Sequence, residues 1–193
     1  HYSLALIPFS KDVTISNVTI AGNINCKVPK TVDQETKEDF PAFVSAVIGL
    51  ADGITTFEAV TVNAKASVSE ETGAQELQVW QGGFLGRYDG TTLNFKNCTW
   101  ESEASLTDER ITDHQRIGGF AATVSGGCIV NVEGCTLSGA VTSQAKANAQ
   151  VGGLIAVSRK NNTINISNLQ VSGARITAAS TNNTSGGLLG YLW

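Results

Sequence analysis

The chain has 193 residues, of which 16% are charged and 7% aromatic, and its formal net charge at pH 7 is −4. This length fits a single all-β domain, and we expect residues 1–193 to form one domain with its own core. The acidic balance offers no basic face and argues against nucleic-acid binding and attachment to an anionic membrane. No apolar run reaches the roughly 20 residues of a membrane-spanning helix, so we expect no membrane insertion.

One short pattern recurs in five segments along the whole chain. In chain order they are TISNVTI (14–20), TFEAVTV (56–62), NFKNCTW (94–100), NVEGCTL (131–137) and NISNLQV (165–171). Apolar residues fill the second, fifth and seventh positions of each segment, which gives three apolar columns that begin with Ile15, Val18 and Ile20. Such regularity indicates a repeat architecture, because one repeat can bury its apolar surface only against its neighbours.

The alternation slips by one position between the first two columns. The residues at the slip are Asn17, Ala59, Asn97, Gly134 and Asn168. Because Asn and Gly tolerate left-handed backbone angles, the slip predicts a corner at which one strand turns into the next. A column of small residues follows the third apolar column, at Gly22, Ala64, Ser102, Gly139 and Gly173.

A second signature of paired glycines opens the repeats. It reads GGFLG at 82, GGFAA at 118, GGLIA at 152 and GGLLG at 186, with SAVIG at 45 as a degenerate member. We expect about three short strands per coil: one at this signature, one or two around the apolar columns, and one after the small column. Because the chain stops soon after the last signature, we also expect it to be a fragment of a longer repeat protein.

The first apolar column steps by 42, 38, 37 and then 34 residues. Since the strand pattern is constant, the variable length has to lie in loops, at 27–42, 69–80, 101–116 and 143–150. Helical repeats would need a 3.6-residue period that this chain lacks. The prediction is an all-β fold, a right-handed parallel β-helix (β-solenoid) of about five coils of 34–42 residues with its loops on one edge.

The combination of GG-L/F-x-G/A, a variable polar stretch and I/V-x-N-x-x-V-x-G resembles the GLUG-type repeat of large secreted bacterial surface proteins. That family includes adhesin-like chains and non-catalytic regions of IgA-specific metallopeptidases. The resemblance covers roughly residues 45–193 and, more weakly, the first 44. It implies an extracellular or cell-surface β-solenoid, whereas the peptidase signature His-Glu-x-x-His is absent from this sequence.

Cys98 and Cys135 lie one repeat apart in the same column. Neighbouring strands of a parallel ladder lie about 4.8 Å apart, which permits a disulfide. The simpler interpretation, which we prefer, is a ladder of two small buried residues. The sequence contains no CxxC pair of the kind that indicates a zinc site, and we expect neither a metal nor a cofactor.

The loop edge is the expected place for binding, since solenoids present variable loops on one side of a rigid stack. Carboxylates beside aromatic residues there would suit Ca²⁺ or a sugar, but we prefer the simpler interpretation that they are solvated loop charges. The candidate residues are Glu70, Glu71, Trp80, Glu101, Glu103, Asp108, Glu109 and His114. We expect none of them to be catalytic.

A file of threonines, at Thr19, Thr61, Thr99 and Thr136, should face outward between the second and third columns. Such a file is also the geometry of an ice-binding surface, but threonine is simply a good residue for an exposed strand. We therefore expect a non-enzymatic structural or adhesive module whose loops bind a host or neighbouring-cell protein or glycan. The alternatives are a polysaccharide-acting β-helix enzyme and a subunit that self-associates head to tail into a filament.

Overall fold

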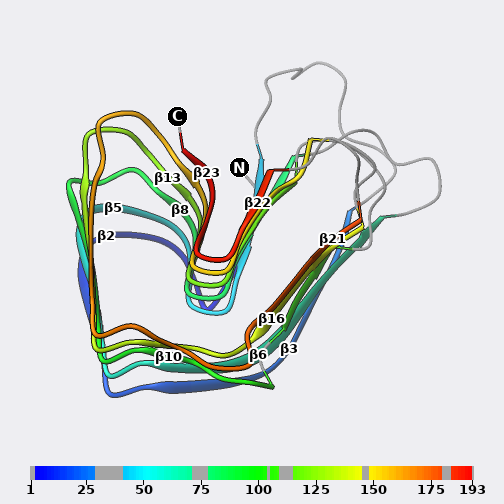
Figure 1. The fold of residues 1–193 in the computed structure, drawn as a ribbon, viewed down its shortest axis with the longest axis horizontal. Helices are drawn as coiled ribbons and strands as arrows, with labels where there is room; N and C mark the ends of the chain where they lie inside the picture. Colours follow the sequence, from blue (N-terminus) through cyan, green and yellow to red (C-terminus); the bar gives the residue numbers. More distant parts are fainter. Residues whose placement is uncertain are drawn as a thin grey trace.

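The computed structural model describes residues 3–28, 41–70, 78–103, 105–108, 115–144, 148–179 and 184–192, without the side chains of Val28 and Glu70. All secondary-structure elements within these ranges are β-strands, and the strands of successive coils stack in parallel. Figure 1 looks along the stack, so equivalent strands of successive coils lie over one another. The predicted all-β parallel β-solenoid is confirmed, and its right-handed winding stays a prediction.

Sheet A receives one short strand from each coil. Its six strands, in spatial order, are β1 (Ser3–Leu4), β4 (Ala42–Ser45), β7 (Val79–Gly82), β12 (Gln115–Gly118), β17 (Gln150–Gly152) and β22 (Thr184–Gly186). From β4 onward each strand ends at the first glycine of the paired-glycine signature or at its equivalent, Ser45. The signature was predicted to contain a strand. In the structure, its first glycine ends a strand and its second glycine lies in a turn.

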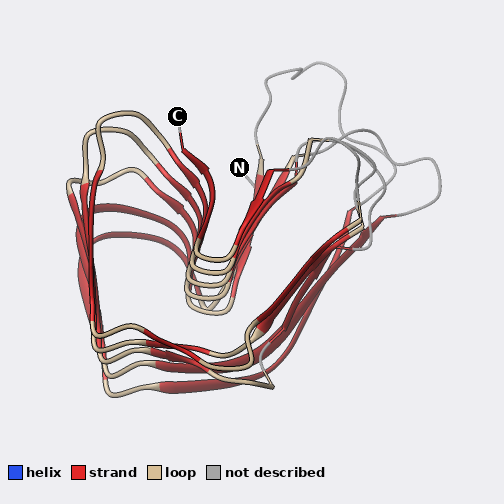
Figure 2. Cartoon of the chain, in the orientation of Figure 1, coloured by secondary structure: helices blue, strands red, loops and turns tan. Residues whose placement is uncertain are grey.

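Sheet B begins after that turn and is long in the first two coils but divided in the later ones. Its nine strands are β2 (Ile7–Ser16), β5 (Ile48–Glu58), β8 (Leu85–Tyr88), β9 (Thr92–Lys96), β13 (Ala121–Val124), β14 (Ile129–Glu133), β18 (Ile155–Ser158), β19 (Thr163–Ser167) and β23 (Leu189–Leu192). β5 pairs with both β8 and β9, so one long strand continues as two. The residues between the two halves form turns (Figure 2).

Sheet C closes each coil. Its eight strands are β3 (Thr19–Val28), β6 (Thr61–Glu70), β10 (Thr99–Trp100), β11 (Ser105–Asp108), β15 (Thr136–Leu137), β16 (Ala140–Ser143), β20 (Gln170–Val171) and β21 (Arg175–Ala178). β3 and β6 run straight through the small column at Gly22 and Ala64, whereas later coils break there. The strand predicted after this column is therefore separate only from the third coil onward.

The apolar columns have the predicted register. In the first column Ile15 pairs with Phe57, Phe57 with Phe95, Phe95 with Val132 and Val132 with Ile166. The third column continues in the same way from Ile20 through Val62, Trp100 and Leu137 to Val171. These side chains point into the stack, where Phe57, Phe95 and Trp100 are 0% exposed. Burial of aromatic and aliphatic rungs is the main stabilising term of such a stack.

The corner between sheets B and C is made by left-handed residues in every coil. Asn17, Ala59, Asn97, Gly134 and Asn168 have φ values of 55°, 51°, 51°, 63° and 52°. The amides of the first four donate to the next coil, for example Asn97 N to Glu133 O at 2.8 Å. The corner predicted from the slipped alternation is therefore confirmed.

The turn between sheets A and B folds each coil back on itself, and Figure 1 shows it as the tight bend in the middle of the cross-section. The first residues of sheet B after this turn therefore face the outer side of sheet A; we call this contact the arm interface. Its sheet A side carries Phe43, Trp80, Arg116, Gln150 and Thr184 in one column. The facing column of sheet B carries Leu50, Arg87, Thr123, Val157 and Tyr191.

Candidate functional site

The loop edge lies between the end of each sheet C strand and the start of the next sheet A strand. Glu71, Glu109 and His114 fall outside the described residues. Glu70 is the last residue of β6, and its side chain is not described. The candidate site therefore has to be judged on Trp80, Glu101, Glu103 and Asp108.

Glu101 and Glu103 lie together on the corner between β10 and β11. Trp100 pairs with Val62 and Ser105 with Lys65, so the third coil has two more residues here than the second. Glu103 is exposed and Glu101 partly so, and the Glu101 amide donates to Val62 O at 3.0 Å. This pair of carboxylates stands on the outside of sheet C.

Asp108 takes a different position from the two glutamates. It is the last residue of β11, it points into the stack, and it is 0% exposed. Gln115 and Ser143 are also fully buried, and Ser143 Oγ donates to Gln115 Oε1 at 2.7 Å. Because Asp108 is internal and Glu103 external, these carboxylates do not converge on one ligand.

Trp80 is held in the arm interface and is only 3% exposed. Its ring packs against Phe43, with 5.6 Å between centroids, and against Ala122. Arg116 Cζ lies 4.3 Å from the Trp80 ring centroid and Arg87 Cζ lies 5.2 Å from it. Trp80 therefore offers no free face on which a sugar could stack, and the same holds for Trp100 and Tyr88, which are buried in the core.

The two arginines on Trp80 differ in their partners. Arg87 Nε pairs with Asp89 Oδ1 at 2.7 Å, and Asp89 also accepts from Ser125 Oγ. Arg116 Nε donates to the neutral acceptor Gln150 Oε1 at 3.2 Å. Burial, followed by repulsion from Arg159 and Arg87, lowers the pKa of Arg116 to about 10.

Cys98 and Cys135 are free thiols, and both are 0% exposed. Cys98 N–H donates to Cys135 Sγ at 3.4 Å, while Cys98 Sγ lies 3.3 Å from Phe57 O and Cys135 Sγ lies 3.5 Å from Phe95 O. Each thiol thus faces a carbonyl of the preceding coil, and no disulfide joins them. The structure agrees with the preferred interpretation of a small-residue ladder.

An asparagine ladder on the outer face of sheet B was missed by the sequence interpretation. Asn94 Nδ2 donates to Thr56 Oγ1 at 3.1 Å, Asn131 Nδ2 to Asn94 Oδ1 at 2.8 Å, and Asn165 Nδ2 to Asn131 Oδ1 at 2.9 Å. A shallow cavity of about 280 Å³ lies between this ladder and Lys96, Glu133 and Ser167. The signal was present as a column of Asn three residues before the corner.

The predicted threonine file is present. Thr19, Thr61, Thr99 and Thr136 pair in register and none of them is buried. The same sheet face also carries Lys65 of β6 and Arg175 of β21, which lie in one column with Ser105 and Ala140 between them. The face is therefore a mixed polar and charged surface, and nothing in its geometry favours ice binding over an ordinary exposed sheet.

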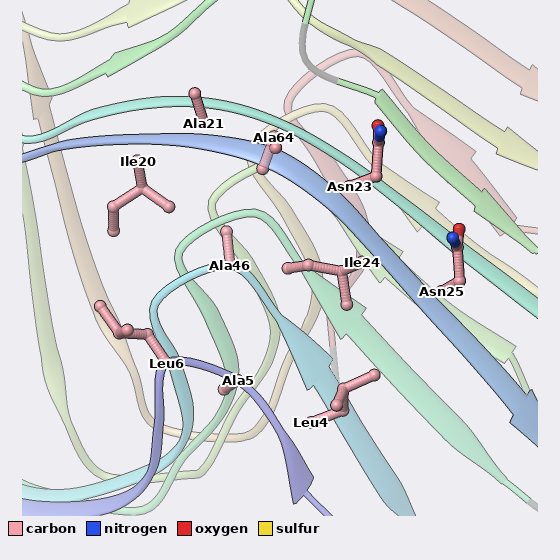
Figure 3. A pocket seen from close by; sticks show the side chains of 11 residues that line it. Leu4, Ala5, Leu6, Ile20, Ala21, Asn23, Ile24, Asn25, Ala46 and Ala64 are labelled. Atoms are coloured by element: carbon pink, nitrogen blue, oxygen red, sulfur yellow. The ribbon is translucent and has the colours of Figure 1, made fainter.

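The first coil leaves an apolar cavity at the end of the stack. Its volume is about 420 Å³, and Figure 3 shows Leu4, Leu6, Ile20, Ile24 and Ala46 around it. Leu6 is 68% exposed and Phe9 59% exposed at the same end. Among the described residues, no polar cap separates the inner columns from solvent at this end.

Comparisons with protein-family models, curated proteins and solved structures found no match. The solenoid fold therefore rests on the structure itself, and the GLUG-type repeat remains an interpretation of the sequence motif. Within the described ranges no group of three or more His, Cys, Asp or Glu side chains is placed to hold a metal ion. The described part of the chain also contains no helix long and apolar enough to cross a membrane.

Proposed function

We propose that this chain is a non-enzymatic structural module of a secreted or cell-surface protein that displays its loop edge to a protein or glycan partner. One observation carries the proposal. The strands keep the same register from coil to coil, while the segments between sheets C and A change in length and sequence. A rigid wall with variable segments at one edge is the usual way in which solenoids present binding surfaces.

The burial of the candidate residues supports a display role over catalysis. Asp108 is internal, whereas Glu101 and Glu103 stand on an outer corner, so these carboxylates share no cleft. A glycoside-cleaving site needs two carboxyl groups on opposite sides of one bond. The GLUG-type assignment, with its secreted bacterial adhesin context, belongs to the same proposal and rests on the paired-glycine motif.

The test is a binding screen on loop-replaced proteins. One variant replaces residues 71–77 and another replaces 109–114, each with a Gly-Ser segment of equal length, and both are applied to an array of neutral and acidic glycans and to intact cells. The matched control is Asn131→Ser, which alters the asparagine ladder on sheet B and leaves the loop edge unchanged. We expect the control to bind as the parent does and at least one loop variant to lose binding. Equal binding by all the variants would overturn display by the loops, and release of reducing sugar from any polysaccharide would overturn the non-enzymatic role.

The second candidate function is head-to-tail assembly, and the open first coil favours it. The edges of β1, β2 and β3 and the apolar cavity beside Leu6 offer a template for another solenoid end. At the opposite end, β22 and β23 rise above β17 and β18, while nothing described lies above β19, β20 and β21. This step makes the ends imperfect complements, so we rank assembly second. Small-angle scattering over a range of concentrations tests it, since a particle of constant length excludes a filament.

A further inference from the structure

The arm interface gathers buried hydrogen-bond donors that lack an acceptor. In the described residues, Trp80 Nε1, Arg116 Nη1 and Thr123 Oγ1 are all inaccessible to solvent and have no hydrogen-bond partner. Trp80 and Arg116 pair directly in register, and Thr123 follows Arg87 in the facing column. Buried polar atoms without partners are rare in folded proteins, and an ion or ordered water commonly satisfies such a group.

Trp80 and Arg116 lie on the sheet A side of the interface, and Thr123 lies in the facing column of sheet B. Arg87 lies 5.2 Å from the Trp80 ring, which shows that the two columns touch in that coil. One coil later the same two columns hold Arg116 and Thr123. Ala122 packs against Trp80 and Phe43, and this small residue allows the two strands to come close. The unpartnered donors thus belong to two facing columns in adjacent coils, and Arg116 Cζ lies 4.3 Å from the Trp80 ring centroid.

The same place is positively charged. The charges of Arg87 and Arg159 are close enough to Arg116 to disfavour its charged form. In the described chain, Asp89 is the one carboxylate that pairs with any of these three arginines. It already binds Arg87 and Ser125. Among the described residues, Arg116 has only Gln150 as an acceptor, although a partly buried guanidinium is normally paired with a carboxylate.

The chemistry of these groups selects the ligand. A tryptophan N–H and a guanidinium can only donate hydrogen bonds, and a threonine hydroxyl is able to donate one. A guanidinium stacked on an aromatic ring keeps its planar edge free to bind two oxygens of an oxyanion at once. Arg116 as a whole is only partly buried, whereas its Nη1 is inaccessible to solvent.

We propose that the arm interface is a binding site for an oxyanion, a carboxylate or sulfate group, held by Arg116 with Thr123 and Trp80 and attracted by Arg87 and Arg159. The site lies on strands β7, β12 and β13, not on the loops, so it goes beyond display by the loop edge. The source of the group is either a free ion or an acidic ligand that carries it.

Calorimetric titration of the full chain at constant, low ionic strength tests the proposal. The probes are sodium sulfate and a galacturonate trisaccharide, because one is a free ion and the other a carried carboxylate. We expect saturable binding of at least one probe with one site per chain. Binding of sulfate alone identifies a free-ion site, and binding of the trisaccharide identifies a carried group; each outcome supports the site.

The variants assign the binding to these residues. Arg116→Gln should weaken binding about tenfold or more, and Arg116→Lys should weaken it about threefold or more because it keeps the charge but loses the planar fork. Thr123→Val keeps the side-chain shape and provides a second test if Arg116→Gln fails to fold. Arg175→Gln is the matched control, since it removes the same charge from the exposed face of sheet C.

The proposal is overturned if neither probe shows saturable binding, or if the Arg116 and Thr123 variants bind as tightly as Arg175→Gln does. A crystal structure grown with the probe that binds in solution, but with only water beside Arg116, would overturn it as well. Replacement of residues 71–77 by a Gly-Ser segment should leave oxyanion binding within about twofold of the parent value, because no residue of the site lies on that segment. Failure of the display function and failure of this site are therefore separate results.

Discussion

The rings of Phe57 and Phe95 stack face to face across two successive coils, with their centroids 5.1 Å apart and an interplanar angle of 6°. Phe84 meets both rings at an edge, at 5.6 Å from each centroid, and Phe120 meets Phe95 at 5.0 Å. These four rings link the first apolar column to the turn between sheets A and B.

Truncation of Phe95 should therefore be among the most damaging single changes in the chain. Phe95→Ala removes a fully buried ring with three aromatic neighbours, and we expect the free energy of unfolding to fall by about 3–5 kcal/mol. The same substitution at Phe9, which is 59% exposed, is the control and should cost about 1 kcal/mol or less. Urea denaturation followed by circular dichroism compares them, and equal losses would contradict this account of the core.

The second glycine of the paired-glycine turn supplies another matched pair. A Cβ on Gly119 would collide with Gly153 O and with the Trp100 ring, whereas a Cβ on Gly187 would meet nothing within 4 Å. We expect Gly119→Ala to lower stability by about 3 kcal/mol or more and Gly187→Ala to change it by about 0.5 kcal/mol or less. Thermal unfolding of the two variants is the measurement, and similar melting temperatures would refute the close packing of this turn.

Ala59 is the one corner residue that is neither Asn nor Gly, and it has a φ of 51°. A left-handed angle costs an alanine roughly 1–2 kcal/mol, which an asparagine largely avoids. Ala59→Asn should therefore stabilise the protein by about 0.5–1 kcal/mol, visible as a higher urea midpoint. Asn97→Ala, the reverse change at the next corner, should destabilise it by a similar amount, and shifts of the same sign in both variants would disprove the corner argument.

Cys128 should make stability depend on pH in alkaline solution. Burial raises the pKa of this thiol from 9.0 to about 11. Because the folded pKa is the higher one, the stabilising contribution is complete below pH 9 and is lost as the pH rises from about 9 to 11. Between pH 8 and pH 11, the free energy of unfolding of Cys128→Ala should therefore fall by about 1–2 kcal/mol less than that of the parent protein. Denaturation curves at these pH values check the effect, and an unchanged pH dependence in the variant would contradict it.

Much of this fold was predictable because it repeats. Three apolar columns, the slipped position and the variable segments fix sheets B and C, the left-handed corner and the loop edge, since side-chain alternation allows only one register. The columns that begin with Ile15 and Ile20 pair as the pattern requires. The shared pattern could not show that Gly22 and Ala64 would stay within continuous strands. The fourth coil has as many residues between Leu137 and Ala140 as the second has between Val62 and Lys65, yet its strand is broken there.

The candidate site was less predictable because it depends on contacts between sheets. Nothing in the local pattern around Trp80 reveals that the outer face of sheet A is covered by the start of sheet B. The signal lay in the fifth position of the paired-glycine signature, where Gly86, Ala122, Ala156 and Gly190 are all small. A Cβ on Gly86 would lie 3.0 Å from Phe43 Cβ and 3.4 Å from Trp80 O, so small residues there mark a close approach of two strands.

The hydrogen bonds between strands all join one coil to the next, as from Thr99 N to Val60 O at 2.9 Å and from Thr136 N to Cys98 O at 2.8 Å. They therefore run along the stack, perpendicular to the strands. A force that pulls the two ends of the solenoid apart would load these hydrogen bonds in tension, and the coils would separate one after another. A force applied across the stack would instead be shared by many rungs at once, which makes this module mechanically weak along its axis and strong across it.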